Sequence, residues 1–337
     1  MRAVVQTRYG TPEAVLQVGE LAKPRISDEE VLVQVRAASV HPDVWHVVAG
    51  RPWMLRWMGA GIRRPRNPVP GSDVAGVVVE VGSKAGRFAV GDEVFGETIL
   101  GTQWNNGGAF AEYVSAPEES LAELPRGVSF EQAASVPTSG FIVWLNLPER
   151  EWFGTQRDVL VNGAGGGVGT IALQISKSLG AHVTAVDHTE KLDLLRNLGA
   201  DRVIDYTRED FTRGDARYDL VFDVPGNHSY STCRQALKPG GRYVLIGHES
   251  FGTEGRRIFG LITSFLLLMV RSRFDPQLGS GRTTVPSRRE TMDLLRDLLA
   301  EGKLTPVVDR TFSLEEVPEA LRYLASGQAR GKILVTP

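Results

Sequence analysis

The pattern of hydrophobic positions along the chain changes near residue 158. Before it, short runs rich in β-branched and aromatic residues alternate with turn formers such as Gly82-Ser83 and Gly107-Gly108. The strands predicted in this part are Arg2–Gln6, Val31–Ala38, Val74–Val81, Glu93–Phe95 and Ala111–Ser115. Their spacing predicts a rolled, mostly antiparallel β-domain.

From Asp158 onward, strand-like and helix-like segments alternate. The predicted strands are Asp158–Asn162, His182–Val186, Tyr218–Val224 and Arg242–Ile246. Helical patterns follow three of them: from a glycine-rich loop through Leu179, over Glu190–Leu198 and over Ser229–Leu237. This alternation predicts a parallel sheet with a six-stranded rhythm and helices on both faces, so the fold class is α/β.

The last third of the chain adds two further elements. Arg288–Ala300 is an amphipathic helix with one apolar stripe. Lys332–Thr336 is a final strand that follows the helical pattern of Glu315–Ser326. Because a strand must pair, we expect this tail to return to the first β-domain.

Composition restricts the partners of the chain. A length of 337 residues favours two domains, and a net charge of −2 leaves no basic field for nucleic acid. The single cysteine, Cys233, excludes an internal disulfide framework and favours a cytoplasmic protein. The apolar run Ile258–Val270 has 13 residues, too few to cross a membrane, and is expected to be a buried or interface helix.

The glycine loop is the strongest chemical signal. Gly163, Gly166 and Gly169 follow a predicted strand in a GxxGxxG spacing, which departs from the strict GxGxxG form. Such a loop lets backbone amides and the following helix dipole meet a pyrophosphate. The predicted cofactor residues here are Gly163, Gly165, Gly166, Gly167, Val168 and Gly169. The alternative is a glycine-rich turn without a ligand.

Asp187 bears on the choice of cofactor. It ends the second strand of this part, 18 residues after Gly169, close to the position at which an acidic residue meets the ribose hydroxyls. A carboxylate there favours NAD(H), because it repels a 2′-phosphate. Lys191, with His188 and Thr189, could instead receive that phosphate if Asp187 turned away, so NADP(H) remains open.

The ends of later strands should line the same crevice. Asn227 and Gly247 follow the predicted strands Tyr218–Val224 and Arg242–Ile246, and the carboxyl ends of strands face the ligand in a doubly wound sheet. We expect them beside the nicotinamide and its ribose. His248 could act on a substrate or lie in a solvated loop.

Several motifs together resemble the medium-chain dehydrogenase/reductase superfamily, in its zinc-free branch of quinone oxidoreductases, zeta-crystallin relatives and enone reductases. Besides the glycine loop they are Gly71–Gly82, Gly91–Gly96, Gly108–Tyr113, Leu198–Asp201, Asp205-Tyr206 and Ala329–Lys332. The resemblance implies a GroES-like substrate domain from residues 1–125 and 284–337 around a Rossmann domain of residues 126–283. It also implies an NAD(P)H cofactor held in part by Tyr206, a small-molecule substrate between the domains, and commonly a homodimer.

The same comparison predicts that no metal is bound. Zinc-dependent members carry a cysteine, a Gly-His-Glu run and a third ligand. The corresponding places hold His41, Ser72 and Asp73, and no cysteine precedes Cys233. His41 and Asp73 could supply two ligands, whereas a catalytic zinc site needs three.

Without zinc, a protein group must polarise the substrate oxygen. Zinc-free relatives show Asn-Pro-x-Asp where this chain reads His41-Pro42-Asp43-Val44, so the candidates are His41 and Asp43, with Thr138 at the domain junction. His41 is either a proton donor or a cap for the turn before Pro42.

Three tryptophans are candidates for the substrate wall: Trp45, Trp53 and Trp57. They could instead pack against the β-domain. Three functions remain open at this point: hydride transfer to an enone or quinone, a zinc-free carbonyl, alcohol or imine oxidoreductase with His41 as the acid, and a non-catalytic NAD(P)H-binding sensor.

Overall fold

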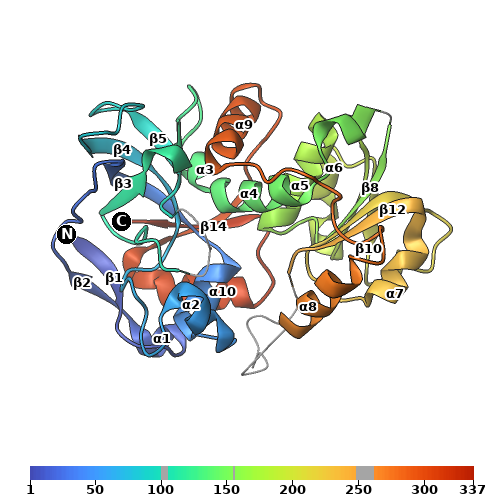
Figure 1. Cartoon of the computed structure of the whole chain (residues 1–337), viewed down its shortest axis with the longest axis horizontal. Helices are drawn as coiled ribbons and strands as arrows, with labels where there is room; N and C mark the ends of the chain where they lie inside the picture. Colours follow the sequence, from blue (N-terminus) through green and yellow to red (C-terminus); the bar gives the residue numbers. More distant parts are fainter. Residues whose placement is uncertain (100–104, 155, 248–261) are drawn as a thin grey trace.

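The structure of the chain is a computed structural model that describes residues 1–99, 105–154, 156–247 and 262–337, with side chains in the last range from residue 266 onward. Two lobes lie side by side along the longest axis (Figure 1). Part of the predicted apolar run and His248 fall outside the described residues. Among the described helices, none is both long enough and apolar enough to cross a membrane.

The first lobe, here called the β-lobe, is built on a rolled sheet. Its order is β13-β14-β3-β4-β5-β7, with β6 paired to β3, and only β13 and β14 run parallel. The strands are β3 (Glu30–Val40), β4 (Asp73–Val81), β5 (Glu93–Glu97), β6 (Tyr113–Pro117), β7 (Leu121–Glu123), β13 (Val308–Ser313) and β14 (Lys332–Thr336). A separate antiparallel hairpin joins β1 (Arg2–Gln6) and β2 (Leu16–Glu20). The predicted antiparallel β-domain is therefore confirmed.

The tail returns to this lobe as predicted. β14 lies between β13 and β3, and Ile333 pairs with Val40. Its first four residues are buried, which explains the apolar run Ile333–Val335. Residues separated by nearly the whole chain are thus joined in one sheet.

The second lobe, here called the Rossmann lobe, carries a parallel sheet in the order β10-β9-β8-β11-β12. The strands are β8 (Asp158–Asn162), β9 (His182–Asp187), β10 (Arg202–Asp205), β11 (Tyr218–Asp223) and β12 (Leu237–Leu245). The predicted six-stranded rhythm is corrected to five strands among the described residues. At the sixth position a single bridge joins Leu278 to Tyr243, since the neighbouring Pro276 and Gly279 do not sustain a ladder.

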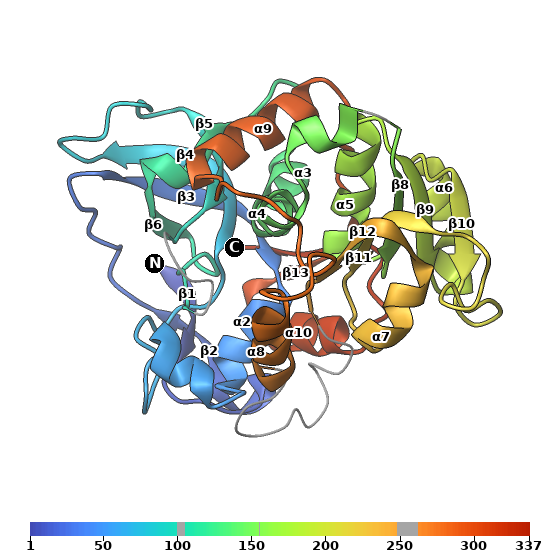
Figure 2. The same cartoon turned by 45° about the vertical axis from the view of Figure 1, so that its right-hand side comes forward.

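Helices cover the Rossmann sheet and join the lobes (Figures 1 and 2). The α-helices of the described residues, of which α1, α2 and α10 belong to the β-lobe, are α1 (Pro12–Val15), α2 (Pro42–Ala49), α3 (Phe130–Ala134), α4 (Pro137–Asn146), α5 (Gly167–Ser178), α6 (Leu192–Asn197), α7 (Tyr230–Cys233), α8 (Ile262–Arg271), α9 (Arg288–Ala300) and α10 (Val317–Ala325). α9 has the predicted bounds, and a capping box between Ser287 and Glu290 fixes its start. The predicted helices Glu190–Leu198 and Ser229–Leu237 are each a short α-helix joined to one 3₁₀ turn.

One hydrophobic core runs through the junction of the lobes. Met292 and Leu295 of α9 belong to the same buried cluster as Val143 of α4, Val161 of β8 and Phe95 of β5. Burial of this shared apolar surface stabilises the relative placement of the lobes. The domain boundaries at residues 125 and 284 stay a prediction, because α9 contacts both lobes.

His46 in α2 makes the stability of the β-lobe sensitive to acid. Its imidazole is buried, and Nδ1 lies 2.8 Å from the Arg51 carbonyl oxygen. Burial lowers the pKa of His46, because the charged form loses solvation. The unfolded chain therefore binds a proton that the folded chain does not, and stability falls as the pH drops below the ordinary histidine pKa of about 6.5.

We expect His46→Asn to weaken this dependence, because its amide keeps a donor for Arg51 and does not titrate. Between about pH 7 and pH 5 the thermal unfolding midpoint should fall less in the variant than in the native chain. His182→Asn removes a partly exposed imidazole and serves as control. Equal pH profiles for the native chain and His46→Asn would contradict the assignment.

Candidate active site

The glycine loop lies between β8 and α5, and each spaced glycine has a distinct structural reason. Gly163 has φ +76, and a Cβ there would lie 2.8 Å from Cδ of Pro225. A Cβ on Gly169 would lie 2.1 Å from the carbonyl oxygen of Gly163, so only glycine allows this contact of helix and strand. At Gly166, the N-cap of α5, the nearest such atom is 3.6 Å away. Of the three spaced glycines, Gly166 therefore has the most free space around its Cα.

The loop leaves amide donors at the start of α5. The amides of Gly163 and Ala164 both donate to the Val186 carbonyl, and that of Gly165 donates to Oδ2 of Asp187. First-turn amides of a helix lack intrahelical acceptors, and no described hydrogen bond uses those of Gly167 and Val168. Together with the helix dipole they form a site of the kind that binds phosphate, although phosphate binding itself stays a prediction.

The C-terminal strand connects this loop to the β-lobe. Gly331 donates its amide to the Gly165 carbonyl at 2.9 Å and forms a bridge with Gly166. Two residues further on, Ile333 pairs with Val40, which directly precedes His41. Register along one strand therefore places His41 and the glycine loop at the same junction.

His41 is the N-cap of α2 and is buried. Its Nδ1 lies 3.4 Å from the Asp43 amide nitrogen and 3.2 Å from Oδ2 of Asp43, so the predicted capping role is confirmed. Its Nε2 is also buried and has no hydrogen-bond partner among the described residues. A buried unpaired polar atom costs about 1–3 kcal/mol, and a bound ligand that hydrogen-bonds to Nε2 would remove this cost.

Thr138 has a different environment from the expected open donor. Its backbone amide and its hydroxyl both lie near Oδ1 of Asp73, at 3.0 and 2.5 Å, and the hydroxyl is 2.8 Å from Oε1 of Glu97. A hydroxyl has one proton, and two buried carboxyl groups already compete for it. The structure supports a positioning role at the lobe junction rather than contact with substrate.

Lys332 is a site residue that was expected only as part of a motif. Its side chain is 4% exposed, and Nζ lies 3.4 Å from both Oδ2 of Asp73 and Oγ of Ser139. Burial lowers the pKa of Lys332, while the carboxylates of Asp73 and Asp43 act in the opposite direction. A Cβ on Gly167 would lie 2.7 Å from the Lys332 stem, which therefore passes directly beneath the loop. In the sequence, a lysine directly before the apolar run Ile333–Val335 was the feature that could have indicated a buried cation here.

A second buried cation braces the same junction. Arg288 of α9 forms an ion pair with Glu97 and stacks on Phe141, 3.6 Å from the ring centroid. Burial lowers the pKa of Arg288 to about 10. Because Glu97 also contacts Thr138, α9, β5 and α4 meet at one polar cluster inside the core.

Asp187 does not lie as expected for a residue that receives ribose hydroxyls. Oδ2 accepts the Gly165 amide at 2.7 Å, and Oδ1 accepts the His188 amide at 2.8 Å. Nζ of Lys191 is 3.6 Å from Oδ1, and both side chains are largely buried. The carboxylate is thus turned into the loop and paired with a cation. Tyr206 stands nearby, 53% exposed, with its ring 5.9 Å from that of His188.

The strand ends gather as predicted at one edge of the sheet. The Asn162 amide at the end of β8 donates to Oδ1 of Asp223 at 2.9 Å and to Oδ1 of Asn227 at 3.0 Å. A Cβ on Gly226 would lie 2.8 Å from the Gly247 carbonyl oxygen. Asn227 and Gly247 are therefore both at the carboxyl edge of the sheet, on which the glycine loop also lies.

The tryptophans are not gathered against this junction. Trp53 and Trp57 are 53% and 75% exposed, so the alternative that they pack against the β-domain gains no support for either. Trp45 is half-buried, edge-on to His46 at 5.3 Å. Trp45 and Trp53 line a cavity of about 400 Å³ whose other walls come from α1, α2 and α10. Their predicted contact with substrate finds no support in this placement.

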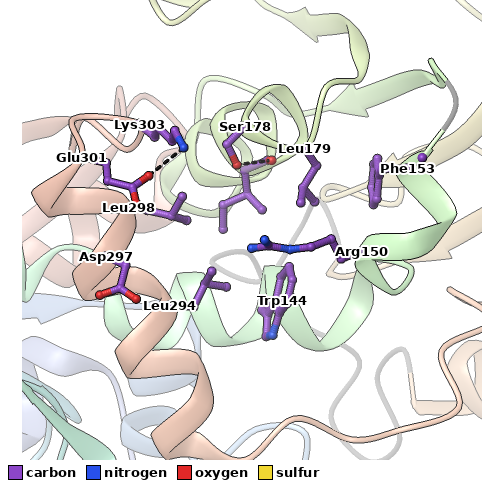
Figure 3. Close-up of a pocket in the computed structure, with 12 residues that line it drawn as sticks. Trp144, Arg150, Phe153, Ser178, Leu179, Leu294, Asp297, Leu298, Glu301 and Lys303 are labelled. Atoms are coloured by element: carbon purple, nitrogen blue, oxygen red, sulfur yellow. Dashed lines mark hydrogen bonds and ion pairs between the residues drawn. The ribbon is translucent and has the colours of Figure 1, made fainter.

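A further cavity of about 500 Å³ lies between α4, α5 and α9 (Figure 3). Trp144 and Leu294 form its apolar floor, and the side chain of Arg150 extends over them. Ser178 and Leu179 place it at the C-terminal end of α5. That end is about 18 Å from the glycine loop, so this cavity is not the dinucleotide site.

The donor atoms of the junction do not fit zinc. In the described part of the chain no group of three or more histidine, cysteine, aspartate or glutamate side chains could hold a metal ion. Both oxygens of Asp73 are engaged by Thr138, Ser39 and Lys332, and Cys233 is buried in the Rossmann core. The zinc-free site stays a prediction, and no chemical step is assigned to a metal.

Comparison with known proteins gives family-model matches in both lobes and relatives that align with the whole chain. Residues 27–126 match the family model of the alcohol dehydrogenase GroES-like domain, and residues 198–335 match the model described as zinc-binding dehydrogenase. The chain is 31% identical to 2-methylene-furan-3-one reductase of Solanum lycopersicum over 345 residues, 100% of this chain and 79% of that protein. It is equally 31% identical to the NADPH-dependent alkenal/one oxidoreductase of Arabidopsis thaliana, over 100% of this chain and 80% of that protein.

A solved structure agrees with these matches. The quinone oxidoreductase from Coxiella burnetii superposes with a TM-score of 0.81 at 26% identity, over 100% of this chain and 99% of that one. The fold, the glycine loop and the relatives that align with the whole chain all indicate one family. The chain belongs to the medium-chain dehydrogenase/reductase superfamily as an NAD(P)-dependent oxidoreductase.

Proposed function

We propose that the chain reduces the conjugated double bond of an enone or the ring of a quinone with NAD(P)H and without zinc. The observation that carries the proposal is the junction, where β14 links the first-turn amides of α5 to His41, whose buried Nε2 has no hydrogen-bond partner among the described residues. The names of the relatives, an alkenal/one oxidoreductase and a quinone oxidoreductase, support the substrate class.

The protein supplies binding, orientation and a proton. Bound NAD(P)H would contribute the hydride. The amides of Gly167 and Val168 would hold the pyrophosphate, and the strand ends at Asn227 and Gly247 would orient the nicotinamide end. His41 would hydrogen-bond to the substrate oxygen through Nε2, and the backbone amide of Asp43, which donates to Nδ1, would orient its ring.

Calorimetry and turnover together test the proposal. Titration of the purified chain with NADPH and NADH should show binding, and cofactor oxidation should be followed with a panel of quinones and enones. Binding followed by turnover of at least one class is the expected result. Binding without turnover of any would favour the non-catalytic sensor, and no binding at all would remove the basis of both readings.

We further propose that NADPH is preferred over NADH. The carboxylate of Asp187 accepts two backbone amides and pairs with Lys191, so its repulsion of a 2′-phosphate is reduced. Lys191 and the exposed Tyr206 stand beside the end of β9, where the adenosine ribose of a Rossmann cofactor lies. The NADPH dependence in the name of one relative agrees with this preference.

Lys191→Ala should raise the KM for NADPH by about 10- to 100-fold, the loss expected for one charged hydrogen bond to phosphate. The KM for NADH should change by less than about threefold, since NADH has no phosphate at this position. Lys303→Ala, which removes an exposed lysine paired with Glu301, is the control. An equal rise for both cofactors would show that Lys191 supports the loop rather than selecting the phosphate. The homodimer stays a prediction, which light scattering would test.

A further inference from the structure

α8 presents an apolar face that the described residues of the chain do not cover. Leu266, Leu267, Met269 and Val270 are 46–71% exposed, and Phe274 just beyond the helix is 84% exposed. Monomeric proteins seldom leave so many large apolar side chains together at the surface unless the surface binds something. None of the residues assigned to the active site lies on this face.

The helix is held in place from its other side. Leu268 packs against the buried cluster of the Rossmann lobe. Arg271 lies over the Tyr230 ring, 4.8 Å from its centroid, and 3.8 Å from Oδ2 of Asp275. The exposed face is therefore fixed by contacts on the opposite face and is not a helix detached from the fold.

A second exposed apolar segment follows α2. Trp53, Trp57, Met58 and Ile62 are 45–75% exposed. α2 and α8 lie in the same lower half of the molecule in both views (Figures 1 and 2). Tryptophan with adjoining aliphatic residues is typical of groups that settle at a membrane–water interface.

The charges of these two segments indicate an anionic partner for this side of the molecule. Residues 44–72 contain five arginines and no acidic residue, and the described residues 262–274 contain two arginines and no acidic residue. The whole chain has a net charge of −2, so positive charge is concentrated in the two segments that carry the exposed apolar side chains. Arg63, Arg64 and Arg273 are exposed.

We propose that α8 and the segment after α2 form a surface that binds anionic lipid membranes peripherally. The apolar side chains would enter the boundary between headgroups and acyl chains, and the arginines would contact the anionic headgroups. A second copy of the chain is a poorer occupant, because contact between two such faces would bring like charges together. We expected no membrane partner, because the apolar run Ile258–Val270 is too short to span a bilayer. Peripheral binding needs no spanning segment, so the proposal departs from that expectation, and it does not depend on the substrate.

Vesicle co-sedimentation of the full chain tests the proposal. Vesicles of phosphatidylcholine with added phosphatidylserine should pellet the protein, whereas phosphatidylcholine alone should not, and high salt should release it. Leu267→Glu should lower the apparent affinity at least tenfold, because it places a carboxylate at the lipid boundary in place of an apolar side chain. Val90→Glu, which introduces the same charge at a 67% exposed apolar position of the β-lobe, should bind like the native chain.

Two further measurements keep the result unambiguous. Cofactor binding by Leu267→Glu should equal that of the native chain, which shows that the variant is folded. Tryptophan emission of the native chain should shift to the blue with anionic vesicles, and Trp57→Ser should reduce that shift. Failure to pellet with anionic vesicles, equal weakening by Val90→Glu, or a dimer abolished by Leu267→Glu without any vesicle binding would each overturn the proposal.

Discussion

Replacement of Gly169 by alanine is expected to abolish measurable NAD(P)H binding and to destabilise the Rossmann lobe. The added Cβ would lie 2.1 Å from the Gly163 carbonyl oxygen and 2.6 Å from Cα of Ala164, both backbone atoms that cannot rotate away. To relieve this overlap, α5 must move away from β8, and its first-turn amides then lose their position relative to a pyrophosphate. We expect a loss of about 1–3 kcal/mol in stability and at least about a 100-fold loss in cofactor affinity.

Gly214→Ala is the matched control, because nothing lies within 4 Å of a Cβ built at that position of the same lobe. Thermal unfolding reports the stability of both variants, and calorimetry with NADPH reports their affinity. Native-like affinity in Gly169→Ala would show that the helix start does not carry the cofactor phosphates. If Gly169→Ala binds NADPH weakly but unfolds at the native temperature, the added Cβ would obstruct the cofactor without displacing α5 from β8.

His41→Asn should lower kcat by about 100-fold or more while the fold is retained. Asparagine is among the best N-cap residues, so the variant keeps a hydrogen bond to the Asp43 amide at the start of α2. It removes the imidazole whose Nε2 is buried and unpartnered in the described structure, and with it the group proposed to give a proton to the substrate oxygen. General acid catalysis commonly contributes 10²–10⁴ to the rate.

The comparison of substrates makes this variant informative about the reaction. If kcat falls with enones and quinones while the KM for NADPH is unchanged, His41 acts on the substrate. If only ketone turnover is lost and quinone turnover survives, the zinc-free carbonyl oxidoreductase is the better description. His41→Ala, which also removes the cap, should lower the unfolding midpoint where His41→Asn does not. Unchanged kcat in both variants with every substrate would contradict the role of His41.

Features that depend on near neighbours in the sequence were predicted well. α9 has the predicted bounds because its apolar stripe and its capping box lie within one segment. β8 and β14 likewise have the predicted bounds, since each is a short apolar run next to glycine. α2 was missed as a helix, because Val44, Val47 and Val48 give it a strand-like composition, although a cap at His41 was one of the two roles predicted for that residue.

Features that depend on distant neighbours were not predictable. Asp73 and Lys332 are separated by 259 residues, and only the folded sheet shows that they share a buried site. The orientation of Asp187 follows from its contacts with the Gly165 amide and Lys191, and its position after a strand did not reveal these two partners. Exposure of Trp53 and Trp57 also required the structure, because aromatic residues in a sequence indicate a core as readily as a surface.

The place of β14 in the β-lobe has a consequence for biosynthesis. β3 obtains its neighbour on one side from residues 332–336, and the glycine loop obtains its contact with Gly331 from the same strand. Neither lobe can therefore reach its final hydrogen-bond pattern while the ribosome is still adding the preceding residues. The N-terminal half of a nascent chain must keep an unpaired strand edge until residues 332–336 have been synthesised, and chaperone protection has the most to prevent during that period.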